Sequence, residues 1–145
     1  MSKTNSWENG LLLLVFNNTN FANVGDATGL RGSSTAGSFY ISLHTADPGE
    51  AGDQTTNEAT YTSYARQAIA RSGAGFTVTN DTVVPAADTS FPASGGTTNV
   101  ITHYGIGTAS SGAGVLLYKG AYTASKSIET GDTPIHKASS SVIEA

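Results

Sequence analysis

The chain has three histidines, His44, His103 and His136, and these are its side chains best suited to catalysis or metal binding. No two of them have the four-residue spacing that places a metal-binding pair on one face of a helix. His44 and His103 lie in segments that alternate apolar and polar residues, so we expect that they can be neighbours on paired strands. The chain has no Gly-x-Ser-x-Gly elbow. The sequence therefore favours histidines that bond to backbone or to a nearby threonine over a catalytic or metal-binding role.

Acidic side chains gather in one polar loop, where Asp47, Glu50 and Asp53 are followed by Glu58. Their spacing differs from that of a calcium loop, which favours a solvated acidic loop over a cation site. No pair of carboxyl groups stands out for glycoside hydrolysis. The glycine-rich run at 105–110 lacks the third glycine of a dinucleotide-binding turn. We therefore expect no cofactor, no metal and no enzymatic activity.

Two arginines, Arg66 and Arg71, lie five residues apart on an expected strand over 64–71, so their side chains should face opposite sides. Arg66 has two open interpretations. It is a buried or interfacial arginine that bonds to carbonyls or an acidic loop residue, or it is an exposed strand charge.

The composition is polar but weakly charged. Charged residues make up 12% of the chain, about half the usual share of ~25%, and the net charge is −4. Glycine, serine and threonine fill the difference, and they favour turns and strands over helices. With only seven basic residues, scattered along the chain, nucleic-acid binding is not expected. The absence of cysteine excludes disulfides and suits synthesis in a reducing cytoplasm.

The longest apolar run, residues 11–16, is too short to cross a membrane and lacks the basic flank of a signal peptide. We expect it to belong to a helix over residues 6–17, with Ser6 as its N-cap. Trp7, Leu11 and Leu14 share one stripe of this helix. The sequence favours packing on the protein's own sheet over docking on a neighbouring subunit.

The rest of the chain reads as short strands separated by glycine-rich turns. Phe39, Ile41 and Leu43 alternate with polar residues, and Asp47-Pro48-Gly49 predicts a turn beyond them. Further strands are expected at 64–71, 76–79, 82–84, 89–91, 99–108, 115–120, 121–124, 134–137 and 141–144. Long polar loops fill 19–38 and 46–60. The pattern predicts one all-β domain over residues 1–145, an antiparallel β-sandwich or jelly-roll-like fold with a short N-terminal helix.

Five segments in order carry a resemblance to a known family: 42–52 (SLHTADPGEAG), 61–66 (YTSYAR), 91–92 (FP), 102–109 (THYGIGTA) and 111–114 (SGAG). With these segments, the region from about Trp7 to Tyr118 resembles a family of small tailed-bacteriophage virion proteins. Its members are labelled head-decoration (cement) or tail-fibre proteins. The family-like structural motif residues are His44, Asp47, Pro48, Gly49, His103, Gly105 and Gly107.

The resemblance implies a non-enzymatic virion structural protein, and two roles follow. The first is a decoration protein on the outer surface of the capsid, made in the host cytoplasm, which stabilises capsomer contacts because it binds only the assembled shell. Its partners would be the major capsid protein and further copies in a dimer or trimer, with neither nucleic acid nor membrane. The alternative is a tail-fibre or tail-tip accessory protein that binds host-surface carbohydrate through exposed tyrosines. The absence of a long shaft favours decoration.

Candidate contact residues are Trp7, Leu11, Leu14 and Arg66. Candidate contact arms, which lack a clear core pattern, are residues 1–5, 19–38 and 120–145.

Overall fold

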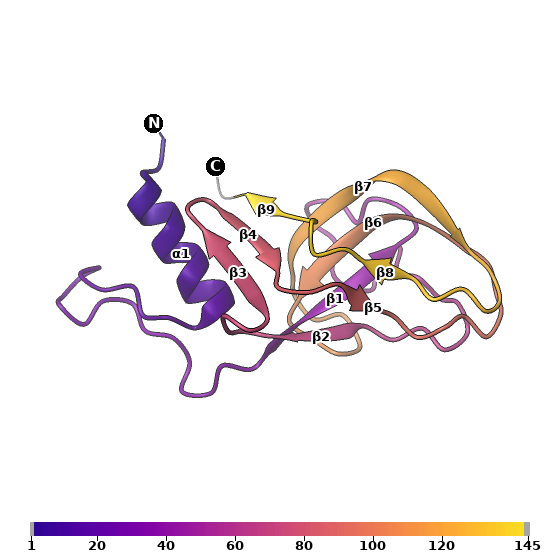
Figure 1. The fold of residues 1–145 in the computed structure, drawn as a ribbon, viewed down its shortest axis with the longest axis horizontal. Coiled ribbons are helices and arrows are strands. Elements are labelled where there is room, and N and C mark those ends of the chain that lie inside the picture. The colour runs from indigo at the N-terminus through magenta and orange to yellow at the C-terminus, as the bar shows by residue number, and fades with distance from the viewer. Residues whose placement is uncertain (1, 144–145) are drawn as a thin grey trace. The chain divides into compact units, whose positions relative to one another are not determined.

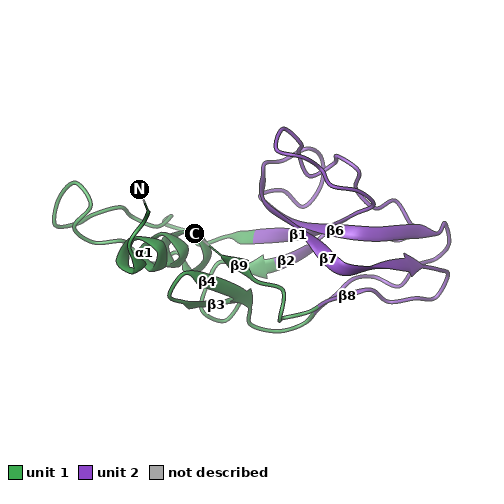
Figure 2. Ribbon diagram, turned by 90° about the horizontal axis from the view of Figure 1, so that it is seen from above, with its two compact units in different colours: residues 1–38, 69–88, 137–145 green, residues 39–68, 89–136 purple. Residues whose placement is uncertain are grey.

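The computed structural model describes residues 2–143 and consists mostly of antiparallel β-sheet with one N-terminal helix (Figure 1). The expected all-β class and the short helix are confirmed. The chain divides into two compact units. Unit 1 comprises residues 1–38, 69–88 and 137–145, and unit 2 comprises residues 39–68 and 89–136 (Figure 2). The single-domain prediction stays a prediction, and each unit is described by itself below.

Unit 1 is built around helix α1 (Asn5–Asn17), which packs against strands β3 (Phe76–Thr79) and β4 (Thr82–Pro85). β3 and β4 form an antiparallel hairpin that turns at Asn80, where φ is 55°, as the sequence predicted for this break. The short strand β9 (Val142–Ile143) pairs with the outer side of β4. Figure 1 shows α1 lying alongside this hairpin.

The buried face of α1 is formed by Leu12 and Phe16, both with no exposed surface. The ring of Phe16 meets Phe76 of β3 edge-on, with the ring centroids 5.0 Å apart. The helix therefore packs on a sheet of its own chain, as the sequence favoured. It begins at Asn5 with Thr4 as N-cap, so the expected capping by Ser6 was wrong.

The loop over residues 19–38 follows α1 and is held by a bridge within the loop, by a contact with the helix and by Arg71. Phe21 and Leu30 form an isolated antiparallel bridge, and the ring of Phe21 covers Gly10 of the helix.

Arg71 donates from Nε to the carbonyl of Val15 at 2.6 Å and from Nη2 to that of Leu14 at 3.0 Å. Its Nη1 donates to the carbonyl of Ala36 at 3.0 Å. A cation at the carbonyl end of a helix satisfies groups that have no partner within the helix. Arg71 therefore caps α1 and ties the loop to it.

A four-stranded sheet has the order β2–β1–β6–β7, in which β1 pairs with β6 and β6 with β7, both antiparallel. β6, β7 and all of β1 except Ser38 lie in unit 2, whereas residues 69–70 of β2 are assigned to unit 1. The strands are β1 (Ser38–His44), β2 (Gln67–Ala70), β6 (Asn99–Gly107) and β7 (Leu116–Ile128). β5 (Thr89–Ser90) and β8 (Ile135–His136) form a separate two-stranded ribbon. Residues 120–128, which the sequence included in a candidate arm, belong to β7 and are followed by β8 and β9.

The apolar core of unit 2 comes mainly from alternate residues of β1 and from apolar residues of β6, together with side chains from its loops. Its buried members include Phe39, Ile41, Leu43, Tyr61, Phe91, Ile101, Tyr104, Ile106 and Ile128. Tyr104 stacks at a tilt on Tyr122, with centroids 5.2 Å apart, and the Tyr122 hydroxyl lies 2.8 Å from Nδ1 of His136. Aromatic pairs of this geometry add to the stability gained from area burial alone.

Burial of α1 gives a first test. Phe16→Ala should lower the free energy of unfolding by about 3–5 kcal/mol, because it removes a fully buried ring and leaves a cavity against Phe76. Trp7 on the same helix is 40% exposed, so Trp7→Ala should cost clearly less. Urea denaturation of both variants checks this. Equal losses would contradict the conclusion that α1 packs mainly through Phe16.

Candidate functional site

One face of the β1–β6 sheet carries a buried polar cluster formed by Ser42, His44, Gln54, Glu58, Tyr64 and Arg66, all within unit 2. His44 and His103 are direct cross-strand partners on β1 and β6, so the expectation that they are neighbours is confirmed. The loop after β1, residues 45–66, supplies the other four side chains of the cluster, and the loop after β6, residues 108–115, supplies backbone carbonyls that accept from Arg66.

The ion pair of Arg66 and Glu58 forms the centre of the cluster. Arg66 Nε donates to Glu58 Oε1 at 2.6 Å and Nη2 donates to Oε2 at 2.8 Å, while the Arg66 side chain is only 3% exposed. Its remaining donors reach the carbonyls of Ala109 (2.9 Å, from Nη1) and Gly112 (2.8 Å, from Nη2). The hydrogen bonds to Glu58 raise the pKa of Arg66 further. Of the two open interpretations, Arg66 is the buried one that bonds to an acidic loop residue and to carbonyls.

Tyr64 links this ion pair to the sheet. Its hydroxyl donates to Glu58 Oε1 at 2.9 Å and accepts from the backbone N–H of Leu43 at 3.0 Å. Burial raises the pKa of Tyr64 well above its usual value, so the phenol keeps its proton. A neutral donor therefore shares the carboxylate of Glu58 with Arg66.

His44 and Ser42 occupy the same face and have no exposed surface. His44 Nδ1 lies 2.8 Å from the carbonyl of Thr56, which can only accept, so Nδ1 carries the proton and Nε2 accepts from the Ser42 hydroxyl, also at 2.8 Å. Burial lowers the pKa of His44. Although a serine beside a histidine resembles a nucleophile and its base, a substrate has no access to either side chain. This histidine instead holds the Thr56 loop on the sheet.

Gly105 and Gly107 explain how polar side chains fit on this face. A Cβ atom at Gly105 would lie 2.8 Å from Ser42 Oγ and 2.9 Å from His44 Nε2. At Gly107 it would overlap the side chain of Gln54, whose Oε1 accepts from the backbone N–H of Ala109 at 2.9 Å. Both glycines are therefore needed because Ser42, His44 and Gln54 occupy the space that side chains there would fill.

The other residues singled out from the sequence lie apart from the buried cluster. Asp47 accepts from the backbone N–H of Gly49 at 2.8 Å, and Gly49 has a φ of 75°, as expected for this turn around Pro48. This bond, followed by one from Lys119, lowers the pKa of Asp47. Lys119 also lies 3.0 Å from Glu50, so two of the loop carboxylates meet a lysine on β7.

The candidate contact residues on α1 lie in unit 1. Trp7 is 40% exposed and packs its ring against Phe21, and Leu11 and Leu14 are partly exposed. Their role in partner binding stays a prediction, as does that of Arg66.

The sequence offered a buried Arg66 bonded to an acidic loop residue without identifying Glu58 as that residue, and it gave no sign of the capping role of Arg71. The Gly105-x-Gly107 spacing places two residues without side chains on one face of a strand, which is a sequence signal for the space that Ser42, His44 and Gln54 fill. Within residues 2–143, no group of three histidine, aspartate or glutamate side chains is arranged to hold a metal ion. Among the described residues, no helix is long and apolar enough to cross a membrane.

Comparison with known proteins agrees with the resemblance noted in the sequence. A family of phage virion structural proteins matches the chain over residues 2–144. The chain belongs to this family, described as podophage GP4 fiber I protein gp80. A search of curated proteins gives no match. The predicted membership of a small phage virion protein family is confirmed.

The ion pair gives a second test. Arg66→Met should destabilise the protein by about 3–5 kcal/mol, because it leaves Glu58 and two carbonyls without their partner in a buried site. Lys119→Met, which removes the surface ion pairs of a β7 lysine with Asp47 and Glu50, should leave the urea midpoint almost unchanged. Similar midpoints for the two variants would contradict a structural role for Arg66.

The lowered pKa of His44 gives a third test. The unfolded chain takes up a proton near pH ~6.5, whereas folded His44 resists protonation, so stability is retained above that pH and is lost as the pH falls toward the folded pKa. His44→Gln should remove part of this loss, and His103→Gln should keep it. Urea midpoints between neutral and mildly acidic pH measure the effect. If His44→Gln shows the same pH dependence of stability as the wild type, His44 is not the source of that dependence.

Proposed function

We propose that this protein is a non-enzymatic structural subunit of a phage fibre. The observation that carries the proposal is the family match, which covers residues 2–144 and is described as a fibre protein. The buried cluster supports it, since its ionisable groups are bonded to one another and to backbone, and they fix loops rather than open onto solvent.

A fibre subunit must form contacts with other copies or with a neighbouring virion protein. Helix α1 offers one such surface, with Trp7 40% exposed beside the partly exposed Leu11 and Leu14. β7 offers another, because it lies at an edge of its sheet and edge strands can pair with a further strand. We propose that a homo-oligomer uses one or both surfaces.

Capsid decoration is the second candidate, with the major capsid protein as partner. The low share of charged residues, 12%, supports it, because interface centres are depleted of charge. A decoration protein would occupy regular positions over the outer surface of the shell.

Cryo-electron microscopy of the purified phage particle distinguishes these roles. We expect density for the described fold in a fibre at the tail. Density at regular positions over the icosahedral head would replace the fibre role with decoration. If mass spectrometry of the particle found no copy of the chain, both roles would be wrong.

A further inference from the structure

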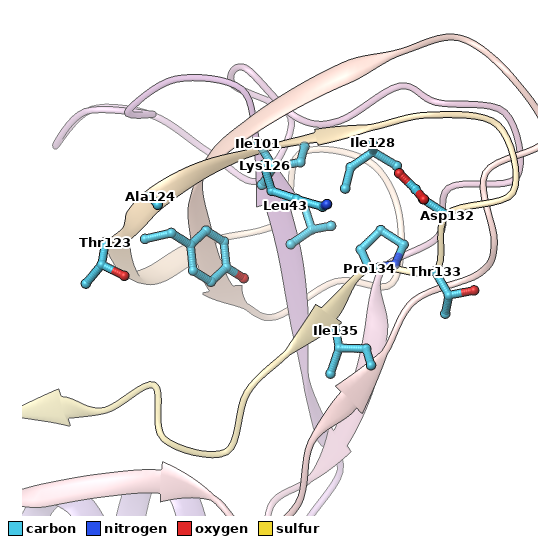
Figure 3. A pocket seen from close by; sticks show the side chains of 11 residues that line it. Leu43, Ile101, Thr123, Ala124, Lys126, Ile128, Asp132, Thr133, Pro134 and Ile135 are labelled. Atoms are coloured by element: carbon cyan, nitrogen blue, oxygen red, sulfur yellow. The ribbon is translucent and has the colours of Figure 1, made fainter.

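Strand β7 is interrupted by a wide bulge. Ile101 and His103 of β6 pair with Lys126 and Ala121 of β7, so residues 122–125 stand opposite a single residue of β6. Bulges break the ladder locally and redirect side chains, and they are frequent beside functional sites. A pocket of about 470 Å³ opens at this bulge, inside unit 2 (Figure 3).

Most of the residues that line the pocket are apolar. Leu43, Ile101 and Ile128 are buried side chains of its inner wall, whereas Ile135 is 47% exposed. Figure 3 shows Leu43 in the middle of the lining side chains, with Ile101 on one side and Pro134 and Ile135 on the other. An apolar pocket that leaves an isoleucine half exposed is suited to an apolar group from outside the chain.

Hydrogen bonds among the protein's own groups fix one wall of the pocket. Phe91 donates from its backbone N–H to the carbonyl of Pro134 at 2.9 Å. Ser94 donates in the same way to the carbonyl of Asp132, also at 2.9 Å. This wall is therefore in place before a partner binds, which lowers the entropic cost of binding.

The opposite end of the β6–β7 ladder carries an exposed apolar tip. The loop over residues 108–115 joins the two strands there, and none of residues 110–115 is buried. Val115, at the end of this loop, is 58% exposed, and Leu117 is 40% exposed. We call Val115 and the loop that carries it the tip.

The tip is ordered although it is exposed. Arg66 donates to the carbonyls of Ala109 and Gly112 at 2.9 and 2.8 Å. The backbone N–H of Val115 donates to Thr108 Oγ1 at 3.0 Å, and the backbone N–H of Thr108 donates to the carbonyl of Val115 at 3.1 Å. Loops on the surface are usually more mobile than the elements that they connect. Because this loop is already held, little entropy is lost when a partner covers it.

The tip of one copy cannot fill the pocket of the same copy. Ile101 lines the pocket and Gly107 precedes the loop of the tip, and these residues are six positions apart on β6. At the rise of an extended strand this separation is roughly 20 Å. Each copy therefore presents both a pocket and a tip to its neighbours.

The chemistry of the two surfaces matches. Residues 108–118 include no charged residue, so the tip carries no charge into an apolar pocket. Lys126 is exposed at the pocket and Asp132 is partly exposed, so both can remain hydrated at the edge of a contact. Such a contact has an apolar centre and a polar rim, as protein interfaces commonly do.

We infer that the tip of one copy binds in the pocket of a second copy of this chain. The contact joins two different surfaces, so it is heterologous and can repeat from copy to copy along a row of subunits. The inference rests on the proposed fibre role and adds which surfaces join successive subunits.

Complementation between two variants of the full chain tests the inference. Val115→Glu alters the tip and Ile135→Glu alters the pocket, and each leaves the other surface intact. Each variant alone should self-associate about tenfold or more weakly than the wild type, because a carboxylate would be buried in an apolar contact. An equimolar mixture should form dimers and nothing larger, since one intact tip and one intact pocket remain in each pair. Sedimentation velocity of the variants and of the mixture measures this.

Val100→Glu is the matched control. Val100 is 49% exposed in the same unit but does not line the pocket, so this variant should self-associate as the wild type does. The inference is overturned if the wild-type chain stays monomeric at millimolar concentration, or if the mixture forms no dimers. It is also overturned if Val100→Glu weakens association as much as Val115→Glu.

Failure of this contact and failure of the fibre role are distinguishable. A monomeric chain that is nevertheless found in a tail fibre would overturn the contact alone. A chain that associates through tip and pocket but is absent from the particle would contradict the fibre role and leave the contact in place.

Discussion

The ordering of unit 2 depends on one buried ion pair. Arg66 uses both edges of its guanidinium, one on Glu58 and the other on the carbonyls of Ala109 and Gly112. A buried arginine is costly unless each donor finds an acceptor, so these acceptors must be placed together for the chain to fold. Because they come from two polar loops far apart in sequence, one side chain determines the conformation of both loops.

In unit 1, the guanidinium donors of Arg71 are also paired with acceptors, but these are mainly backbone carbonyls. Its guanidinium meets the carbonyls of Leu14, Val15 and Ala36, which the end of helix α1 and the following loop leave without strand partners. A chain with few charges thus uses two arginines, five residues apart, to order long glycine- and threonine-rich loops. Few apolar side chains are available in those loops, which explains why backbone carbonyls rather than hydrophobic contacts hold them.

The sequence predicted the fold class well, because period-two alternation marks strands such as β1 and the polar turns mark their ends. The neighbouring positions of His44 and His103 also followed from that pattern. The choice between burial and exposure of Arg66 did not follow from it, because the partners of a long side chain are set by loop conformation. The bulge in β7 was missed since Tyr122, Thr123 and Ala124 continue a strand-like composition, and only the register with β6 shows that they leave the ladder.

The bulge has a consequence for how this sequence can diverge. On either side of it the β6–β7 ladder is held by its own pairs, His103 with Ala121 and Ile101 with Lys126. Residues 122–125 have no paired residue on β6. Their number can therefore change without moving the paired parts of β7 on either side. In an ordinary strand, one inserted residue would turn every later side chain to the other face. Here an insertion or deletion would change only the bulge itself. Related chains could therefore differ in the surface formed by residues 122–125 while the surrounding sheet stays the same.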